Sequence, residues 1–164
     1  MTPSDRDLVQ RTGNLLHRAG KTLSVAESCT GGMLGGLLTS VAGASNWFAG
    51  GVIAYSNRLK TDLLNVPEAV IESTGAVSRR TAAAMAAGVM ERTGTDLALA
   101  VTGIAGPSGG TPEKPVGTVC MALLDEDGCR TWEELFAGDR EEIRIDASRF
   151  LVRELELYLE ESVQ

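Results

Sequence analysis

Aromatic residues, histidine and cysteine are all scarce in this chain of 164 residues. Aromatic side chains make up 4% of it, so we expect Leu, Val, Ile and Ala to build the core. The three cysteines form no CxxC pair, and there is one histidine, His17, which we place on the surface near a helix end. This dispersed set argues against a disulfide framework and against a zinc site, so we expect no metal or other cofactor.

Long apolar runs and an excess of positive charge are also missing. No run is long enough to cross a membrane, and the polar residues 1–7 contain no apolar signal core. We therefore expect a cytoplasmic protein with no membrane partner. The net charge is −7, whereas nonspecific nucleic-acid binding needs a basic face, so we expect no nucleic-acid partner. The length and the 43% hydrophobic content fit one globular domain over residues 1–164.

Helix and strand signals alternate along most of the chain. The periodicity predicts strands over residues 22–26, 50–55, 97–101, 116–124 and 130–136, the last two forming an antiparallel hairpin. It predicts helices over residues 4–19, 33–41, 58–64, 67–73, 78–93 and from 139 onward, the first of them capped by Ser4 or Asp5. Strands that alternate with helices indicate an α/β fold, with a mostly parallel sheet covered on both faces.

In such sheets, ligands bind beyond the carboxyl ends of the strands. Three turn-rich segments follow these ends, namely Ser28 with its neighbours, residues 55–60 and residues 102–110. We expect these segments, which are far apart in the sequence, to meet at one edge of the sheet.

Ser28 lies at a strand-to-helix turn and is a candidate nucleophile. Thr30, Gly31 and Gly32 follow it, and the N–H groups of a helix N-terminus attract negative charge. The alternative is that Ser28 or Thr30 is only an N-cap. Cys29 is a competing nucleophile, but it has no evident histidine partner, so we rank it below Ser28.

Lys60 is the candidate base, because His17 is an improbable partner and lysine is a recognised alternative. It would act only with a lowered pKa, and Tyr55 could orient it or relay a proton. The alternative for Lys60 is an exposed helix lysine without a catalytic role.

The glycine-rich residues 103–110 form a third candidate site segment. They lack the Gly-Lys-Ser/Thr of a P-loop and the spacing of a dinucleotide fingerprint. A loop of this length in a compact domain is usually functional, so we expect a backbone-lined ligand loop, with Lys114 and Asp139-Arg140 as possible anion contacts. The alternative is an ordinary turn between strands.

Together, these motifs resemble the CinA carboxy-terminal domain family, whose characterised members are nicotinamide-nucleotide amidases. The resemblance covers about residues 4–160 and is carried by seven segments in order. They are Ala26-Glu27-Ser28-Cys29-Thr30-Gly31-Gly32, Gly43 to Phe48, Tyr55-Ser56-Asn57 with Lys60, Gly75-Ala76-Val77-Ser78, Thr102-Gly103-Ile104-Ala105-Gly106-Pro107, Lys114-Pro115-Val116-Gly117-Thr118-Val119, and Gly138-Asp139-Arg140.

The resemblance implies a three-layer α/β/α sandwich on a mixed five-stranded sheet, mostly parallel with one antiparallel strand. It implies metal-free hydrolysis of nicotinamide mononucleotide to nicotinate mononucleotide and ammonia. By motif, Ser28 is the nucleophile, Lys60 the general base and Tyr55 an assisting group. The implied substrate-binding positions are Thr30, Gly31, Gly32, Ser45, Asn57, Thr102, Gly103, Ala105, Gly106, Gly110 and Arg140.

The resemblance also implies a homo-oligomer, such as a dimer. Many family members carry an additional amino-terminal domain similar to molybdopterin-binding proteins, which we do not expect in this chain, nor the pyrophosphatase-type activity associated with that domain. The alternative function is a non-catalytic nucleotide-binding or interaction module linked to DNA uptake or recombination.

Overall fold

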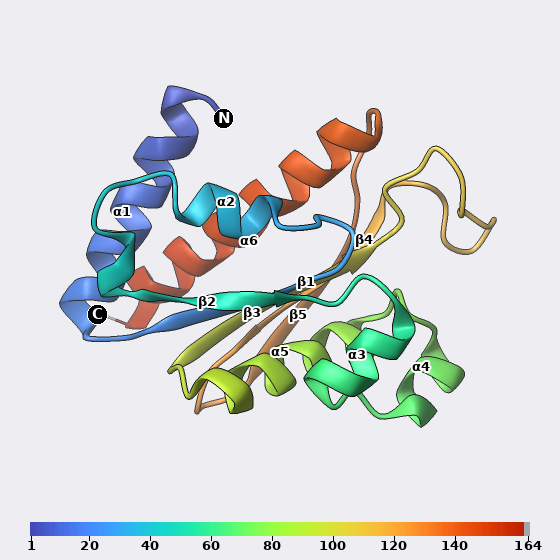
Figure 1. Ribbon diagram of the computed structural model, residues 1–164. Helices are drawn as coiled ribbons and strands as arrows, with labels where there is room; N and C mark the ends of the chain where they lie inside the picture. Colours follow the sequence, from blue (N-terminus) through green and yellow to red (C-terminus); the bar gives the residue numbers. More distant parts are fainter. Residues whose placement is uncertain (163–164) are drawn as a thin grey trace.

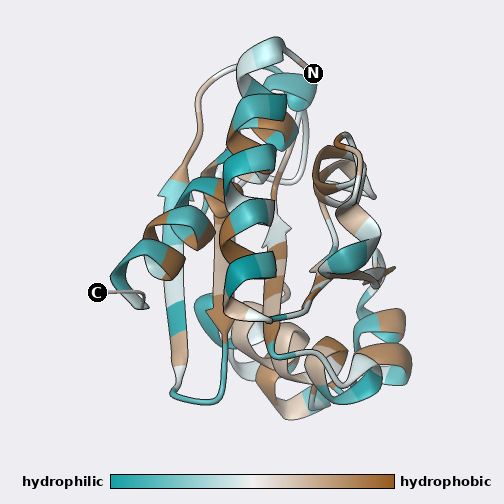
Figure 2. Cartoon of the chain, turned by 90° about the vertical axis from the view of Figure 1, so that its left-hand side faces the viewer, coloured by the Kyte–Doolittle hydropathy of each residue, from teal (hydrophilic) through white to brown (hydrophobic). Residues whose placement is uncertain are grey.

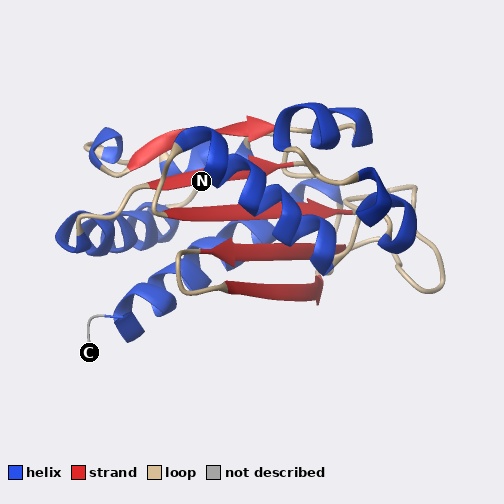
Figure 3. Ribbon diagram, turned by 90° about the horizontal axis from the view of Figure 1, so that it is seen from below, coloured by secondary structure: helices blue, strands red, loops and turns tan. Residues whose placement is uncertain are grey.

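A five-stranded sheet forms the middle layer of the computed structural model, which describes residues 1–162. Its strand order is β2-β1-β3-β4-β5. Strand β1 pairs in parallel with β2 and β3, and β4 runs antiparallel to both β3 and β5 (Figure 3). The predicted mixed sheet with one antiparallel strand is therefore confirmed. The strands span Leu23–Glu27 (β1), Phe48–Ile53 (β2), Leu97–Gly103 (β3), Thr118–Leu124 (β4) and Cys129–Leu135 (β5).

Helices cover both faces of this sheet (Figure 1). One face carries α1 (Pro3–Ala19), α2 (Met33–Leu38) and α6 (Arg140–Ser162). The other face carries α3 (Asn57–Leu64), α4 (Glu68–Thr74) and α5 (Arg79–Thr93). A short 3-10 helix, η1 (Ala44–Asn46), precedes β2. Hydrophobic residues concentrate in the central strands, while the helices show hydrophilic outer faces (Figure 2). Within residues 1–162, no helix has both the length and the hydropathy needed to span a bilayer.

Small residues bring α5 very close to its neighbours. A Cβ atom on Gly88 would lie 1.8 Å from the carbonyl oxygen of Leu64, at the end of α3. Only glycine permits this approach of two backbones. The packing of α5 therefore fixes the position of α3, the helix that carries Lys60.

The predicted helix ends agree with the structure to within one residue, apart from the end of α2, and the predicted cap of α1 also differs. Helix α1 begins after Thr2, which forms a capping box with Asp5, so neither Ser4 nor Asp5 is the N-cap. Helix α2 ends at Leu38, three residues before the predicted end. Gly35 and Gly36 give this helix a low intrinsic propensity, and the Thr39 hydroxyl bonds to the Gly35 carbonyl oxygen at 2.9 Å.

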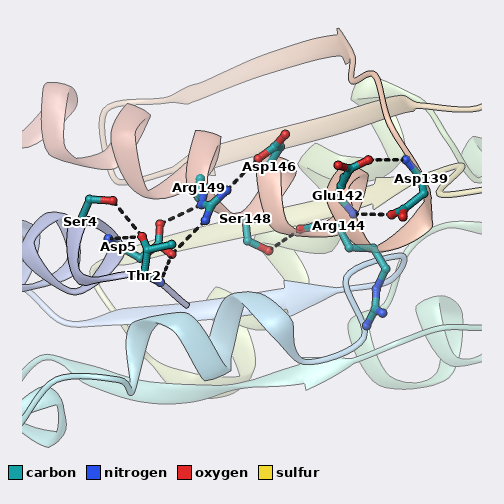
Figure 4. Close-up of polar contacts among 9 residues, drawn as sticks. All are labelled: Thr2, Ser4, Asp5, Asp139, Glu142, Arg144, Asp146, Ser148 and Arg149. Atoms are coloured by element: carbon teal, nitrogen blue, oxygen red, sulfur yellow. Dashed lines mark hydrogen bonds and ion pairs between the residues drawn. The ribbon is translucent and has the colours of Figure 1, made fainter.

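An ion pair joins α1 to α6 on the upper layer (Figure 4). Arg149 donates to the two carboxylate oxygens of Asp5 at 2.8 Å and 3.0 Å. Asp5 also accepts the N–H of Thr2 at 2.7 Å. The hydrogen bonds from Arg149 hold the pKa of this buried carboxyl well below its ordinary value. The pair therefore fixes the amino-terminal helix to α6.

Candidate active site

The carboxyl ends of the three parallel strands meet at one edge of the sheet. Glu27, the last residue of β1, is paired with Ile53 in β2 and with Val101 in β3. Ser28 follows directly, and its N–H donates to the carbonyl oxygen of Val101 at 3.0 Å. The sequence prediction that Ser28, residues 55–60 and residues 102–110 share one edge is confirmed.

Ser28 and Lys60 are in direct contact at this edge. The Lys60 Nζ atom lies 2.9 Å from the Ser28 Oγ atom. Lys60 Nζ also donates to the carbonyl oxygens of Ala54 at 3.1 Å and Tyr55 at 3.3 Å. A neutral amine has two N–H bonds and one lone pair. With its N–H bonds directed at these two carbonyls, its lone pair is free to accept the proton of Ser28.

Lys60 is a buried lysine, with 1% of its surface exposed. Burial lowers its pKa, because the low-dielectric interior disfavours the charged ammonium. Within residues 1–162, Lys60 forms no ion pair. Asp62, the nearest carboxylate in the sequence, pairs with Arg58 on the exposed face of α3. The exposed-lysine alternative is therefore wrong, and the site favours the neutral form that a general base requires.

Cys29 is poorly suited to the competing role of nucleophile. Its thiol is buried, and burial raises the thiol pKa to about 12. A thiol in this state is protonated at neutral pH. The structure therefore supports ranking Ser28 above Cys29.

The turn after Ser28 is organised by a residue that sequence reasoning did not select, Glu27. Its buried carboxylate accepts four hydrogen bonds, from the Thr30 hydroxyl and from the N–H groups of Gly32, Leu34 and Gly35. The start of α2 is thus occupied by a protein carboxylate. Neither Ser28 nor Thr30 is the N-cap, because that position belongs to Gly32 with φ 98°.

This arrangement corrects the substrate-binding prediction for Gly32 and for the Thr30 side chain, whereas the backbone N–H of Thr30 remains available. The Thr30 hydroxyl is bonded to Glu27 at 2.6 Å, and the Gly32 N–H is bonded to Glu27 at 2.9 Å. Gly31 lies on the surface with φ 58°, and its N–H donates to the Ser28 carbonyl oxygen at 3.1 Å. Over residues 1–162, the N–H groups of Cys29 and Thr30 are the two in this turn that donate to no other residue.

Arg144 in α6 is a second residue that sequence reasoning missed. Its Nε donates to the carbonyl oxygen of Cys29 at 3.1 Å, and its Nη2 donates to that of Thr30 at 2.8 Å. Figure 4 shows this side chain extending away from α6. Its spacing of one helical turn from Arg140 places both cations on one face. Arg144 contacts backbone carbonyl oxygens, which every residue carries, so no residue type in the sequence indicates this contact.

Tyr55, Gly106 and Arg140 form a cluster next to the dyad. Arg140 donates to the Gly106 carbonyl oxygen at 2.7 Å and to the Tyr55 hydroxyl at 3.0 Å. Tyr55 is 58% exposed, and the atom that contacts Lys60 is its backbone carbonyl oxygen, whereas its hydroxyl contacts Arg140. Arg140 stands in the first turn of α6, after an Asp139 side chain that accepts the N–H groups of Glu141 and Glu142, the latter shown in Figure 4.

The glycines at the end of β3 and in the loop after it are required by close packing, which the sequence did not reveal. Cβ atoms on Gly103, Gly106 and Gly110 would lie 2.8 Å, 2.5 Å and 2.6 Å from atoms of Val119 or Val116. The loop therefore folds closely against the segment that leads into β4. Ala105 is buried in the core, and the Thr102 hydroxyl donates to the Ala76 carbonyl oxygen at 2.8 Å, so both are already occupied by protein contacts.

Three further predicted contacts lie elsewhere. Ser45 belongs to η1, which precedes β2, so it lies at the opposite edge of the sheet from Ser28. Asn57 is exposed and lines a cavity between α3 and α4. The ammonium of Lys114 donates to the carbonyl oxygens of Thr74 and Val77 at 3.1 Å and 2.5 Å, so two of its three N–H bonds are already used within the protein.

Comparison with known proteins identifies the family. The model of the CinA C-terminal domain matches residues 5–159. A CinA-like protein of Citrifermentans bemidjiense is 53% identical over 138 residues, which are 84% of this chain and 33% of the relative. One from Parasynechococcus marenigrum is 60% identical over 126 residues, or 77% of this chain and 30% of the relative. The chain thus spans about a third of the length of these relatives.

Solved structures agree with this assignment over nearly the whole chain. The competence/damage inducible protein CihA from Agrobacterium tumefaciens has a TM-score of 0.93 and 38% identity, covering 98% of both chains. A CinA superfamily protein from Klebsiella pneumoniae has a TM-score of 0.92 and 32% identity, covering 96% of this chain and 98% of that one. The family resemblance predicted from the motifs is confirmed, and the chain belongs to the CinA C-terminal domain family.

Proposed function

We propose that this chain is a serine–lysine amidohydrolase that deamidates nicotinamide mononucleotide to nicotinate mononucleotide and ammonia. The observation that supports the chemistry is the 2.9 Å contact between the Ser28 hydroxyl and a buried Lys60 whose pKa is lowered. The proposed substrate comes from the family resemblance. Two guanidinium groups at this edge, Arg140 and Arg144, are consistent with an anionic substrate in a chain of net charge −7.

The reaction begins with neutral Lys60 taking the Ser28 proton while Oγ attacks the carboxamide carbon. The tetrahedral intermediate places negative charge on the former carbonyl oxygen. The N–H groups of Cys29 and Thr30 are the donors that the turn leaves available to it, and one such donor contributes about 3 kcal/mol.

Protonated Lys60 then gives its proton to the leaving nitrogen, so that ammonia departs and a Ser28 ester remains. Water attacks this ester as Lys60 takes one of its protons. Collapse of the second intermediate releases the carboxylic acid, which ionises to the carboxylate in water, and the proton returns from Lys60 to Ser28. We assign Tyr55 to this machinery through its carbonyl, which orients Lys60, and through its hydroxyl, which with Arg140 borders the substrate.

Ammonia release from nicotinamide mononucleotide by the purified protein tests the proposal, with NAD and nicotinamide as comparison substrates. We expect turnover with the mononucleotide, loss of turnover in Ser28→Ala, and retained turnover in Ser73→Ala, an exposed serine in α4. Ser28→Cys should retain some activity and accumulate an acyl-enzyme detectable by mass. Full activity of Ser28→Ala would eliminate Ser28 as the nucleophile. Binding of the mononucleotide without turnover would favour the non-catalytic module.

A further inference from the structure

Glu27 is a buried charged residue that the proposed reaction does not consume. It is 2% exposed, and its carboxylate carries four hydrogen bonds of 2.6 Å to 3.1 Å. Three of these come from backbone N–H groups at the start of α2, where a helix attracts negative charge. All four hydrogen-bond donors lie within residues 30–35, the segment that follows Ser28 and begins α2.

The main chain of Glu27 is connected to the other half of the dyad. Its carbonyl oxygen accepts the N–H of Ala54 at 2.8 Å, and the Ala54 carbonyl oxygen accepts Lys60 Nζ at 3.1 Å. The same residue therefore holds the nucleophile turn with its side chain and the lysine segment with its backbone. A shift of Glu27 would alter the contact between Ser28 and Lys60 from both sides.

We propose that Glu27 is the positioning residue of the active site, holding the turn after Ser28 so that its hydroxyl faces Lys60 and the Cys29 and Thr30 N–H groups stay available. This inference rests on the proposed serine–lysine chemistry. Carboxylates are suited to the task because they accept from several donors at once and form short charge-assisted hydrogen bonds. A glutamine of equal length would turn its NH₂ group toward N–H donors and lose part of this set.

Two adjacent glycines in α2 allow a matched test. A Cβ on Gly35 would lie 3.3 Å from Glu27 Oε1, closer than ordinary van der Waals contact, so the carboxylate must shift by a few tenths of an ångström. A Cβ on Gly36 meets nothing within 4 Å. Both changes replace glycine with a better helix former in the same turn. Gly35→Ala and Gly36→Ala therefore share any gain in helix propensity, and only Gly35→Ala disturbs Glu27.

The variants are assayed for kcat and KM in ammonia release, for melting temperature, and for the rate at which a fluorophosphonate labels Ser28. We expect Glu27→Gln to lower kcat at least tenfold and Gly35→Ala at least fivefold, with KM within twofold of wild type. The labelling rate should fall by similar factors. Gly36→Ala should keep kcat and labelling unchanged and raise the melting temperature, and Glu68→Gln, an exposed acid in the first turn of α4, should change neither rate.

Equal kcat and labelling in Gly35→Ala and Gly36→Ala would overturn the inference, as would a Glu27→Gln variant within twofold of wild type. If Glu27→Gln does not fold, the glycine pair decides alone. If the wild type labels at Ser28 but releases no ammonia, the proposed substrate is wrong and the labelling rates still test Glu27. A wild type that neither labels nor turns over would refute both proposals.

Discussion

Lys60 Nζ and Ser28 Oγ are 2.9 Å apart although their residues are separated by 32 positions in the sequence. Parallel strands β1 and β2 bring them together, since Ser28 follows the first strand and Lys60 lies one helical turn into the helix after the second. The contact is buried, and the pKa of Lys60 is lowered there by burial. The contact with Ser28 and the lowered pKa of Lys60 are the basis of the next two predictions, on the pH dependence of the rate and on the substitution of Lys60.

The rate should depend on pH through Lys60. Because burial lowers the lysine pKa, the neutral base becomes available below its ordinary value of about 10.4. We expect kcat/KM to rise with pH and to level off after an inflection below that value. Initial rates measured in overlapping buffers at constant ionic strength test this. An inflection at or above the ordinary lysine value would contradict it.

Lys60→Arg should abolish turnover while retaining the positive charge. Arginine stays protonated in proteins and cannot accept the Ser28 proton, and a general base contributes about 10²–10⁴-fold in rate. The measurement is kcat in ammonia release, with Lys21→Arg before β1 as a control that should behave as wild type. A Lys60→Arg variant with more than a tenth of wild-type kcat would exclude the proposed role.

Arg144→Met should lower kcat about tenfold. The variant loses both hydrogen bonds to the carbonyls of Cys29 and Thr30, and hydrogen bonds to charged groups contribute about 1.5–3 kcal/mol. Arg153→Met, on the exposed side of the same helix, serves as the control. Single-turnover rates separate an effect on acylation from one on product release. Identical rates in the two variants would show that Arg144 does not support the turn.

Asp5→Asn should lower the free energy of unfolding by about 2 kcal/mol at pH 7, because Arg149 loses its buried carboxylate partner and keeps only Asp146. The pKa of Asp5 is lowered in the folded state, so its contribution is complete above the unfolded value of about 3.9 and is lost as the pH falls below it. Denaturant unfolding at pH 7 and pH 3 tests this, with exposed Asp7→Asn as a control. The difference in the free energy of unfolding between wild type and Asp5→Asn should be smaller at pH 3 than at pH 7. An equal difference at both pH values would contradict a lowered pKa for Asp5.

Gly88→Ala should destabilise the protein by at least about 3 kcal/mol, despite alanine's higher helix propensity. Its Cβ would lie 1.8 Å from the Leu64 carbonyl oxygen, so α3 and α5 must move apart. Thermal unfolding measures this loss. Because α3 carries Lys60, we also expect lower activity in the folded fraction. An unchanged melting temperature would mean that the two helices do not pack this closely.

The sequence predicted the layers of the fold because its periodicity is regular. Buried strands such as Leu97–Gly103 and helix signals such as Ser78 before α5 are local features, and the structure contains both. The alternation of strands and helices then placed Ser28 and Lys60 at one edge. Local patterns and the order of elements were sufficient for this much.

The details of the site depend on contacts that are not local. Glu27 directly follows the strand predicted over residues 22–26, and its four hydrogen bonds become visible only when α2 is placed beside it. The glycines of residues 103–110 suggested a ligand loop, yet Gly106 and Gly110 are required by close approach to Val116. Ser45 was implied by the family resemblance alone, and the direction of β2 removes it from the site. Side-chain contacts with backbone atoms are what the sequence could not predict.

The hydrogen bonds from Arg144 to the Ser28 turn also bear on the order in which the site is completed during synthesis. Ser28 and Lys60 lie in the first half of the chain, whereas Arg140, Arg144 and Arg149 all belong to the last helix. A nascent chain that has not yet released α6 has the dyad residues but lacks the cations that brace the turn, the glycine loop and α1. We therefore expect the proposed catalysis to require the docking of α6 against the earlier segments.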